Sequence, residues 1–190
     1  MAIQLIVGLA NPGKEYATTR HNAGAWWVLS MCTQQNISLQ TQTKLQASVG
    51  QSQLGNVKFR CAVPTTYMNH SGQAVAAIAK YFNIPATDIL VVHDELDFAP
   101  GTIRLKSGGG HGGHNGLRDI IPQLGTDSFH RLRIGIGHPG DRDQVSDYVL
   151  SNPSKSDKQL IDNAIQSSLA LLPAILASDW QTAMNLLHQV

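Results

Sequence analysis

Residues 89–94 read Ile-Leu-Val-Val-His-Asp, and this stretch decides how the rest of the chain is interpreted. Its apolar run has no polar alternation, which predicts a strand covered on both faces. Strands of that kind occur in α/β proteins, where helices pack on the two sides of one sheet. Asp94, which ends the run, is therefore expected at the carboxyl edge of the sheet, where such proteins bind ligands.

The segments on either side of this strand alternate between strand and helix patterns. Further strands are predicted over residues 3–7, 47–54, 57–63, 103–106 and 131–137, with a hairpin turn at Gly55-Asn56. Helices are predicted over residues 23–35, 71–82, 116–124, 157–176 (kinked at Pro173) and 179–188. The prediction is an α/β fold of one domain, residues 1–190: a single twisted, mixed, mostly parallel sheet with helices on both faces.

The composition of the 190 residues excludes several protein classes. Apolar residues make up 42% and charged residues 14%, which is too apolar for a disordered chain and too sparsely charged for a coiled coil. No run approaches the roughly 18 apolar residues of a membrane span, and the N-terminus lacks a signal-peptide pattern. Cys32 and Cys61 are too few for a disulfide-stapled secreted protein. We therefore expect a cytoplasmic protein without membrane contact.

A glycine-rich loop covers residues 107–116, which read SGGGHGGHNG. Glycine lets a backbone approach a ligand closely, and His111, His114 and Asn115 add polar groups to the loop. This combination predicts a polar ligand held against main-chain amides. Around the loop, residues 99–142 hold six basic residues and three acidic ones, although the whole chain has a net charge of +1. The surplus predicts a local basic patch, and a mixed solvated surface fits the same count.

Three ligand-binding motifs match only in part. Residues 8–14 have the GxxxxGK spacing of a P-loop, but Glu15 follows where a P-loop has Ser or Thr for magnesium. Residues 108–113 have the GxGxxG spacing of a dinucleotide site, without a suitable acid downstream for the ribose. His111 and His114 could bind a metal, but their spacing and flexible loop are unlike those of zinc sites.

His21 and Asp94 form the best-supported catalytic pair. His21 lies just before the helix at residue 23, and its unperturbed pKa near neutrality suits a general base. The carboxylate of Asp94 can accept a hydrogen bond from one imidazole nitrogen and stabilise the imidazolium that forms when the other accepts a proton. Because no GxSxG nucleophile elbow is present, water is the expected nucleophile. Neutral groups that could hold carbonyls and hydroxyls follow three strands: Asn11, Asn69 and Asn115.

Five segments of the chain resemble bacterial peptidyl-tRNA hydrolase. They are residues 6–24 (IVGLANPGKEYATTRHNAG), 63–72 (VPTTYMNHSG), 92–101 (VHDELDFAPG), 108–120 (GGGHGGHNGLRDI) and 129–140 (FHRLRIGIGHPG). The resemblance extends over residues 3–187. It implies a monomeric, cytoplasmic, single-domain α/β esterase that needs no metal or other cofactor. The implied reaction is hydrolysis of the ester between a peptide and the terminal ribose of tRNA, which recycles tRNA from prematurely released chains.

The same resemblance implies a role for individual residues. His21 would activate water, Asp94 would stabilise the basic form of His21, and Asn11 would contact the peptide side of the substrate. The tRNA end and the scissile region would be bound by a cleft made of Tyr16, Tyr67, Met68, Asn69, His114 and Asn115. The phosphates of tRNA would be gripped by three basic residues: Arg104, Lys106 and Arg133.

Two functions of other classes stay open on the residues alone. The basic residues between positions 104 and 133 would also suit a non-catalytic RNA-binding module. The glycine-rich segments at residues 8–14 and 108–113 would suit a nucleotide-binding protein. Turnover of a blocked aminoacyl-tRNA separates the hydrolase from both of these alternatives.

Overall fold

The computed structural model describes residues 2–187, and its centre is a seven-stranded sheet with the order β2-β3-β4-β1-β5-β7-β6. Strands β4, β1, β5 and β7 are parallel, whereas β2–β3, β3–β4 and β6–β7 are antiparallel pairs. The strands are Leu5–Gly8 (β1), Gln40–Gln42 (β2), Ala47–Leu54 (β3), Val57–Pro64 (β4), Ile89–Glu95 (β5), Ile103–Ser107 (β6) and His130–Gly135 (β7). A mixed sheet with a parallel centre confirms the predicted fold class.

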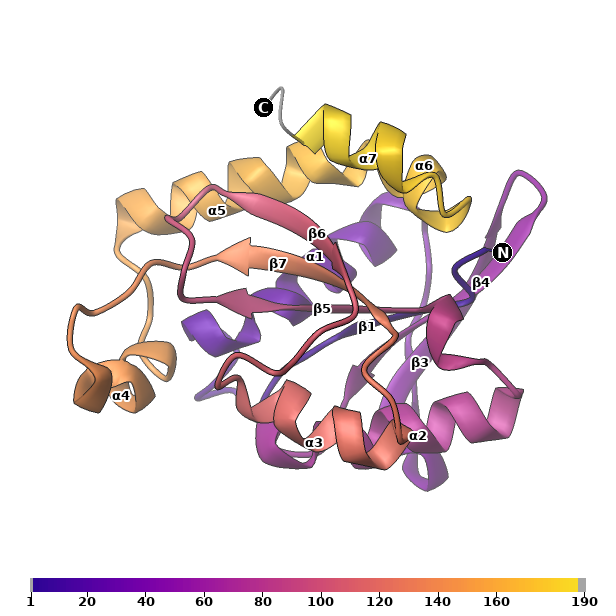
Figure 1. Cartoon of the computed structure of the whole chain (residues 1–190), viewed down its shortest axis with the longest axis horizontal. Helices are drawn as coiled ribbons and strands as arrows, with labels where there is room; N and C mark the ends of the chain where they lie inside the picture. The colour runs from indigo at the N-terminus through magenta and orange to yellow at the C-terminus, as the bar shows by residue number, and fades with distance from the viewer. Residues whose placement is uncertain (1, 188–190) are drawn as a thin grey trace.

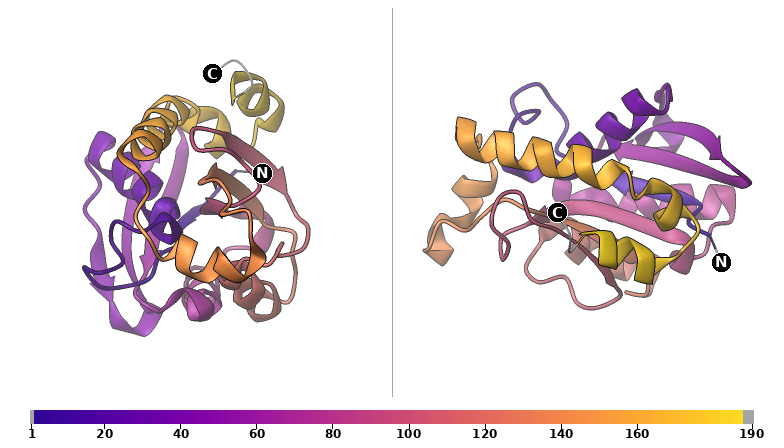
Figure 2. Two further views of the ribbon diagram at one scale, coloured as in Figure 1. Left: turned by 90° about the vertical axis from the view of Figure 1, so that its left-hand side faces the viewer. Right: turned by 90° about the horizontal axis from the view of Figure 1, so that it is seen from above.

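Helices cover both faces of the sheet (Figures 1 and 2). They are Ala23–Gln34 (α1), Ser71–Phe82 (α2), Asn115–Leu124 (α3), Val145–Val149 (α4), Lys155–Leu169 (α5), Leu172–Leu176 (α6) and Trp180–Leu187 (α7). Helices α2 and α3 pack on one face, and α1, α5, α6 and α7 pack on the other. The short helix α4 lies beyond the carboxyl ends of β5 and β7. None of the helices described is long and apolar enough to cross a membrane.

Strand β5 is buried on both faces, as its apolar run predicts. Leu90 and Val92 belong to the core cluster beneath α1 and α5, whereas Ile89 and Val91 belong to the cluster beneath α2 and α3. All four side chains are fully buried. Each contributes about 1.5–3 kcal/mol through burial, so the unbroken run specifies a central strand.

The helical prediction for residues 157–176 was wrong in one respect, because the chain forms two helices there. Helix α5 ends at Leu169, and α6 begins at Leu172 with Pro173 in its first turn. Proline is tolerated in a first turn, where its missing N–H has no intrahelical partner, so Pro173 helps to begin a helix and does not kink one. Strand β2 and helix α4 were not predicted; both are short. Residue 188 of the last predicted helix lies outside the described residues.

The first turn of α1 lies directly on the backbone of the sheet. A Cβ atom at Gly24 would overlap the carbonyl oxygen of Val92 in β5. At the same place the N–H of Leu9 donates to the Val92 carbonyl (3.0 Å), and the N–H of Ala25 donates to the Leu9 carbonyl (3.2 Å). This close approach holds the preceding 3-10 turn, Arg20–Asn22, at the carboxyl ends of β1 and β5. His21 is therefore brought to the edge where Asp94 lies.

Candidate active site

A cavity of about 700 Å³ opens beyond the carboxyl ends of the central strands. The segments that follow β1, β4 and β5 contribute to its lining, together with the glycine-rich loop and α4. Nine of the predicted site residues line it: Asn11, Tyr16, His21, Tyr67, Met68, Asn69, Asp94, His114 and Asn115. The remaining three, Arg104, Lys106 and Arg133, do not.

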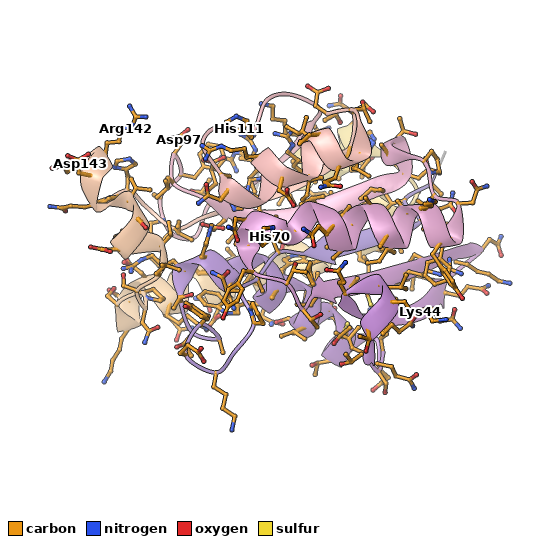
Figure 3. The ribbon with its side chains drawn as sticks, turned by 90° about the horizontal axis from the view of Figure 1, so that it is seen from below. Lys44, His70, Asp97, His111, Arg142 and Asp143 are labelled. Atoms are coloured by element: carbon orange, nitrogen blue, oxygen red, sulfur yellow. The ribbon has the colours of Figure 1, made fainter. Side chains whose placement is uncertain are left out.

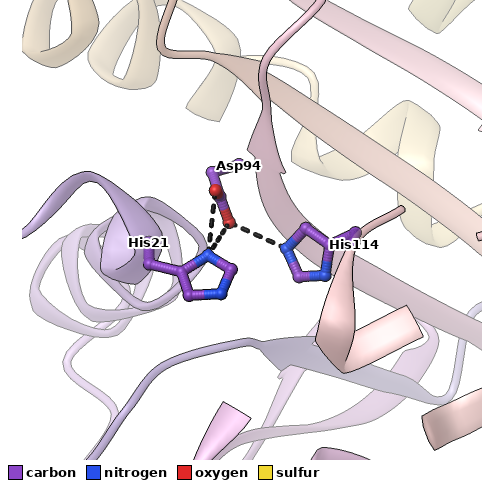
Figure 4. A group of neighbouring side chains, drawn as sticks. All are labelled: His21, Asp94 and His114. Carbon is purple, nitrogen blue, oxygen red and sulfur yellow. Dashed lines mark hydrogen bonds and ion pairs between the residues drawn. The ribbon is translucent and has the colours of Figure 1, made fainter. Parts of the chain in front are cut away.

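His21 and Asp94 both line this cavity. Their side chains are in direct contact (Figure 4). The Nδ1 atom of His21 lies 3.0 Å from each carboxylate oxygen of Asp94, and both side chains are buried. A carboxylate only accepts hydrogen bonds, so Nδ1 carries the proton and donates it. The other ring nitrogen, Nε2, is left with its lone pair. This is the arrangement of a general base braced by an aspartate.

The two groups shift each other's pKa in opposite directions. Burial alone would raise the pKa of Asp94, but the charge of His21 and the hydrogen bonds from His114 and His21 outweigh it and hold that pKa below its usual value. Burial alone would lower the pKa of His21, but the charge of Asp94 and its hydrogen bond raise it above 6.5. Asp94 therefore stays ionised near neutrality, and His21 is a stronger base than a free imidazole.

His114 makes a second hydrogen bond to the same carboxylate. Its Nε2 donates to Oδ1 of Asp94 at 2.8 Å. Its Nδ1 accepts from the backbone N–H groups of Gly116 (3.1 Å) and Leu117 (3.4 Å) and so caps the N-terminus of α3. The cap fixes the neutral tautomer with the proton on Nε2. The sequence implied only that His114 shapes the cleft, whereas the structure places it in contact with Asp94.

The same three side chains could be mistaken for a metal site. Ligand atoms of His21, Asp94 and His114 lie within 4.8 Å of one another. A metal on Nε2 of His114 would need the lone pair of that nitrogen and would move the proton to Nδ1. There it would oppose the N–H donors of Gly116 and Leu117, so these residues do not fit a metal ion. The His111 of the predicted motif lies apart from this cluster.

His93 supports Asp94 from within the sheet and was not assigned a catalytic role from the sequence. It is almost fully buried, and its Nδ1 donates to the backbone carbonyl of Asp94 at 2.7 Å. Burial lowers the pKa of His93 to about 3. The ring is therefore neutral at every pH where the enzyme is expected to work. In the sequence, the only indication of this supporting role was that His93 immediately precedes Asp94 at the end of a strand.

Two of the three asparagines that line the cavity, Asn11 and Asn115, are oriented by hydrogen bonds to their side-chain oxygen atoms. Oδ1 of Asn11 accepts from the backbone N–H of Met68 at 2.7 Å, and the Asn11 backbone exchanges two hydrogen bonds with the side chain of Asn22. Oδ1 of Asn115 accepts from Arg118 at 3.0 Å. In both side chains the amide N–H groups have no partner among the described residues. They are therefore available as donors to a carbonyl or an oxyanion.

The predicted basic residues lie together on the β6–β7 edge of the sheet. Arg104 is directly opposite Arg133 across the antiparallel pair, and Lys106 is opposite Arg131, so all four share one face. Arg131, which was not assigned a role from the sequence, is buried and donates to the carbonyls of Gly109 and Gly110. It therefore anchors the glycine-rich loop, and the other three are left as the exposed or half-exposed cations of this face.

Two charged residues that line the cavity, Asp97 and Arg142, were given no role there from the sequence, whereas His111 was singled out only as part of the glycine-rich loop. Asp97, His111 and Arg142 gather at one end of the molecule, and all three line the cavity (Figure 3). They come from different segments of the chain, and the local patterns of Asp97 and Arg142 do not differ from those of an ordinary solvated loop. Only the fold brings them to one opening.

The partial nucleotide motifs lack the structure that would support them. No helix follows residues 8–14 directly, since the first α-helix begins at Ala23. The glycine-rich loop does join a strand to a helix, but that strand, β6, is an antiparallel edge strand. A dinucleotide fingerprint belongs to a parallel βαβ unit, so neither motif supports nucleotide binding.

Comparison with known proteins gives the family. The family model described as peptidyl-tRNA hydrolase matches residues 5–190. A peptidyl-tRNA hydrolase of Legionella pneumophila is 54% identical over 97% of this chain and 98% of its own. One of Pseudomonas paraeruginosa is 56% identical over 98% and 97%. The crystal structure of peptidyl-tRNA hydrolase from Acinetobacter baumannii is similar with a TM-score of 0.94 and 47% identity, covering 97% of this chain and 94% of that one.

Proposed function

The chain belongs to the peptidyl-tRNA hydrolase family, and we propose that it cleaves peptidyl-tRNA with water activated by His21 and Asp94. The bond hydrolysed is the ester between the peptide and the terminal ribose of tRNA. The observation that supports these roles is the hydrogen-bonded contact of His21 with Asp94 inside the cavity. We further propose that the chain acts as a monomer in the cytoplasm, as the resemblance implies.

The first step is attack of water on the ester carbonyl. Nε2 of His21 accepts a proton from the water as its oxygen bonds to the carbonyl carbon. Asp94, which accepts the hydrogen bond from Nδ1, stabilises the imidazolium that results. An aminoacyl ester is already reactive, so a positioned base that contributes about 100- to 10,000-fold suits the task.

The second step expels the ribose. The tetrahedral intermediate carries a negative oxygen, for which the free amide N–H groups of Asn11 and Asn115 are candidate donors. As the bond to the ribose oxygen breaks, His21 returns its proton to that oxygen from Nε2. The products are a peptide with a free carboxylic acid, which releases its proton to solvent, and a tRNA with a free terminal hydroxyl, and His21 is neutral again.

Asn11 also supports the distinction between blocked and free aminoacyl groups. A peptidyl group has an amide carbonyl next to the last residue, and a free aminoacyl group has a charged amine there. The neutral amide N–H of Asn11 can donate to the carbonyl but not to an ammonium group. A site that hydrogen-bonds one substrate group discriminates strongly against a substrate without it.

Hydrolysis of defined substrates tests this function. We expect rapid release from N-acetyl-aminoacyl-tRNA, slow release from free aminoacyl-tRNA, and the same rates in EDTA. Loss of hydrolysis in EDTA would indicate a metal enzyme instead. Binding of tRNA without any turnover would indicate an RNA-binding module.

Replacement of the base tests the assignment of His21. His21→Ala should lower kcat by about 100- to 10,000-fold, because the general base is lost. Thermal stability and affinity for tRNA should be kept. The matched control is His138→Ala, since His138 lines the same cavity but has no hydrogen bond to Asp94. Equal losses in the two variants would move the base elsewhere.

A further inference from the structure

Arg20 is a buried cation next to His21 that the proposed chemistry does not use. Only 8% of it is exposed, although arginine is rarely buried without an acidic partner. Among the residues described, no carboxylate lies within ion-pair distance of it. Its charge must therefore be balanced by neutral groups.

Those groups belong to the end of α4 and the residues after it. Nη1 of Arg20 lies 2.7 Å from Oγ of Ser151, 2.9 Å from the carbonyl of Asn152, and 3.3 Å from the carbonyls of Tyr148 and Ser151. The backbone N–H of Arg20 also donates to the carbonyl of Ser151 at 3.1 Å. The guanidinium carbon lies 4.0 Å from the centre of the Tyr148 ring.

These contacts have a clear electrostatic basis. The last carbonyls of a helix lack intrahelical donors and carry the negative end of the helix dipole, so a cation there is stabilising. The hydroxyl of Tyr148 donates to the carbonyl of Ile136 at 2.7 Å. Ile136 begins the segment, residues 136–152, that contains α4. Residues 136–152 are thus held in place near both of their ends. Arg20 makes most of the hydrogen bonds at the end formed by residues 148–152.

Helix α4 forms the outer wall of the cavity. Val145, Ser146, Val149 and Leu150 line it, and we call these residues the α4 wall. The wall stands away from the sheet, beyond the carboxyl ends of β5 and β7 (Figures 1 and 2). Of these four residues only Val149 is buried. With so little apolar anchoring, the wall depends on its polar bonds to keep its position.

We propose that Arg20 is a positioning residue that holds the α4 wall at a set distance from His21. Arg20 and His21 are consecutive in one 3-10 turn, so the wall and the base share one support. A substrate enclosed by the wall is thereby held against Nε2 of His21. The inference rests on the proposed function of this cavity. It adds that the contact of Arg20 with α4 sets the distance between the α4 wall and His21.

The test replaces Arg20 by methionine, which keeps much of the side-chain volume. We expect Arg20→Met to lower kcat/KM by about 10- to 100-fold, mainly through KM, because misplacement of a binding wall loosens substrate positioning. Arg20→Lys, which keeps the charge and one donor nitrogen, should recover part of the loss. The control is Arg60→Met, since Arg60 also stacks on an aromatic ring, that of Phe82, at 3.9 Å, but does not line the cavity. Arg60→Met should affect thermal stability without raising KM.

A second variant and a second measurement keep the proposal testable if Arg20→Met folds poorly. Ser151→Ala removes the nearest acceptor from an exposed residue and should raise KM in the same direction. Trypsin should also cut after Arg142 faster in Arg20→Met and Ser151→Ala than in Arg60→Met, because the wall is released. This readout needs no substrate, so it is independent of the roles of His21 and Asp94. Unchanged KM and unchanged cleavage in Ser151→Ala, or in a folded Arg20→Met, would overturn the proposal.

Discussion

At the level of single residues, the proposed chemistry depends on the carboxylate of Asp94, to which two histidines are hydrogen-bonded. Asp94 accepts hydrogen bonds from His21 and from His114, and its own backbone carbonyl accepts one from His93. In each of the three histidines, this hydrogen bond places the proton on the donating ring nitrogen, and the second ring nitrogen is unprotonated. Only His21 has its unprotonated nitrogen free for water, since that of His114 caps α3 and that of His93 is buried. Three histidines therefore surround Asp94, and one can act as the base.

The raised pKa of His21 predicts how activity depends on pH. Only neutral His21 accepts a proton, so kcat/KM should fall as the pH is lowered, with a midpoint above 6.5 because Asp94 raises the pKa of His21. In Asp94→Asn the charge is lost and burial acts alone, so the midpoint should move to lower pH while the maximal rate falls. The measurement is a pH–rate profile on N-acetyl-aminoacyl-tRNA. An unchanged midpoint in Asp94→Asn would show that Asp94 does not set this pKa.

The same shift has a consequence for stability with the opposite pH trend. A histidine whose pKa is raised by folding contributes stability below its unfolded pKa of 6.5, and this contribution is lost as the pH rises through the higher folded value. Activity should therefore increase over the pH range in which the His21–Asp94 pair contributes less to folding. Urea unfolding of wild type and Asp94→Asn over this range serves as the control for the rate profile.

At the scale of elements, the packing of α1 on the sheet positions His21, the proposed base. The first turn of α1 approaches the backbone of β5 so closely that residue 24 has room only for glycine. Such contact leaves little freedom for the 3-10 turn before the helix. The position of His21 relative to Asp94 is therefore determined by helix-on-strand packing, and the two residues are 73 positions apart in the chain.

Gly24→Ala tests this packing. The added methyl group would overlap the Val92 carbonyl, so α1 must shift outward, and the free energy of unfolding should fall by about 1–3 kcal/mol. The shift should also lengthen the His21–Asp94 contact and lower kcat. Urea unfolding and steady-state kinetics measure the two effects. In the control Gly110→Ala the added atom meets open space, so stability should change little, and an equal loss there would contradict the packing argument.

At the scale of the whole molecule, the residues proposed to bind tRNA and those proposed to carry the chemistry lie in different places. The net charge is only +1, yet Arg104, Lys106 and Arg133 lie on one face of the β6–β7 edge, outside the cavity. A tRNA bound there through phosphates could extend its end into the cavity. Phosphate contacts of this kind position a nucleic acid without reading its sequence, which suits an enzyme that accepts many tRNAs.

Arg104→Ala combined with Lys106→Ala tests this separation. KM should rise and its dependence on salt should flatten, with the slope of log KM against log salt falling by about 2, while kcat is kept. Lys44→Ala is the control, because Lys44 is exposed beside β2 and β3 at the opposite edge of the sheet (Figure 3). A loss confined to kcat would contradict the phosphate-binding role.

Much of this architecture could be predicted from local sequence because its causes are local. The apolar run at residues 89–92 specifies a buried strand, and amphipathic spacing specifies α2. The pairing of His21 with Asp94 was also predicted, since both follow signals that end or begin an element at the same edge of an α/β sheet. The short helix α4 could not be predicted, because five residues have too few local bonds to be specified without tertiary contacts.

The amino-acid sequence by itself therefore determined the fold class and the edge of the sheet at which the cavity lies, and it predicted that His21 pairs with Asp94. Only the tertiary structure decided that His114 shares Asp94, that Arg131 anchors the glycine-rich loop, and that Arg20 fastens α4. The physical reason is the range of the interactions. Strand and helix patterns arise from neighbours along the chain, whereas a buried donor finds its acceptor among groups that the fold brings within 3 Å from distant segments.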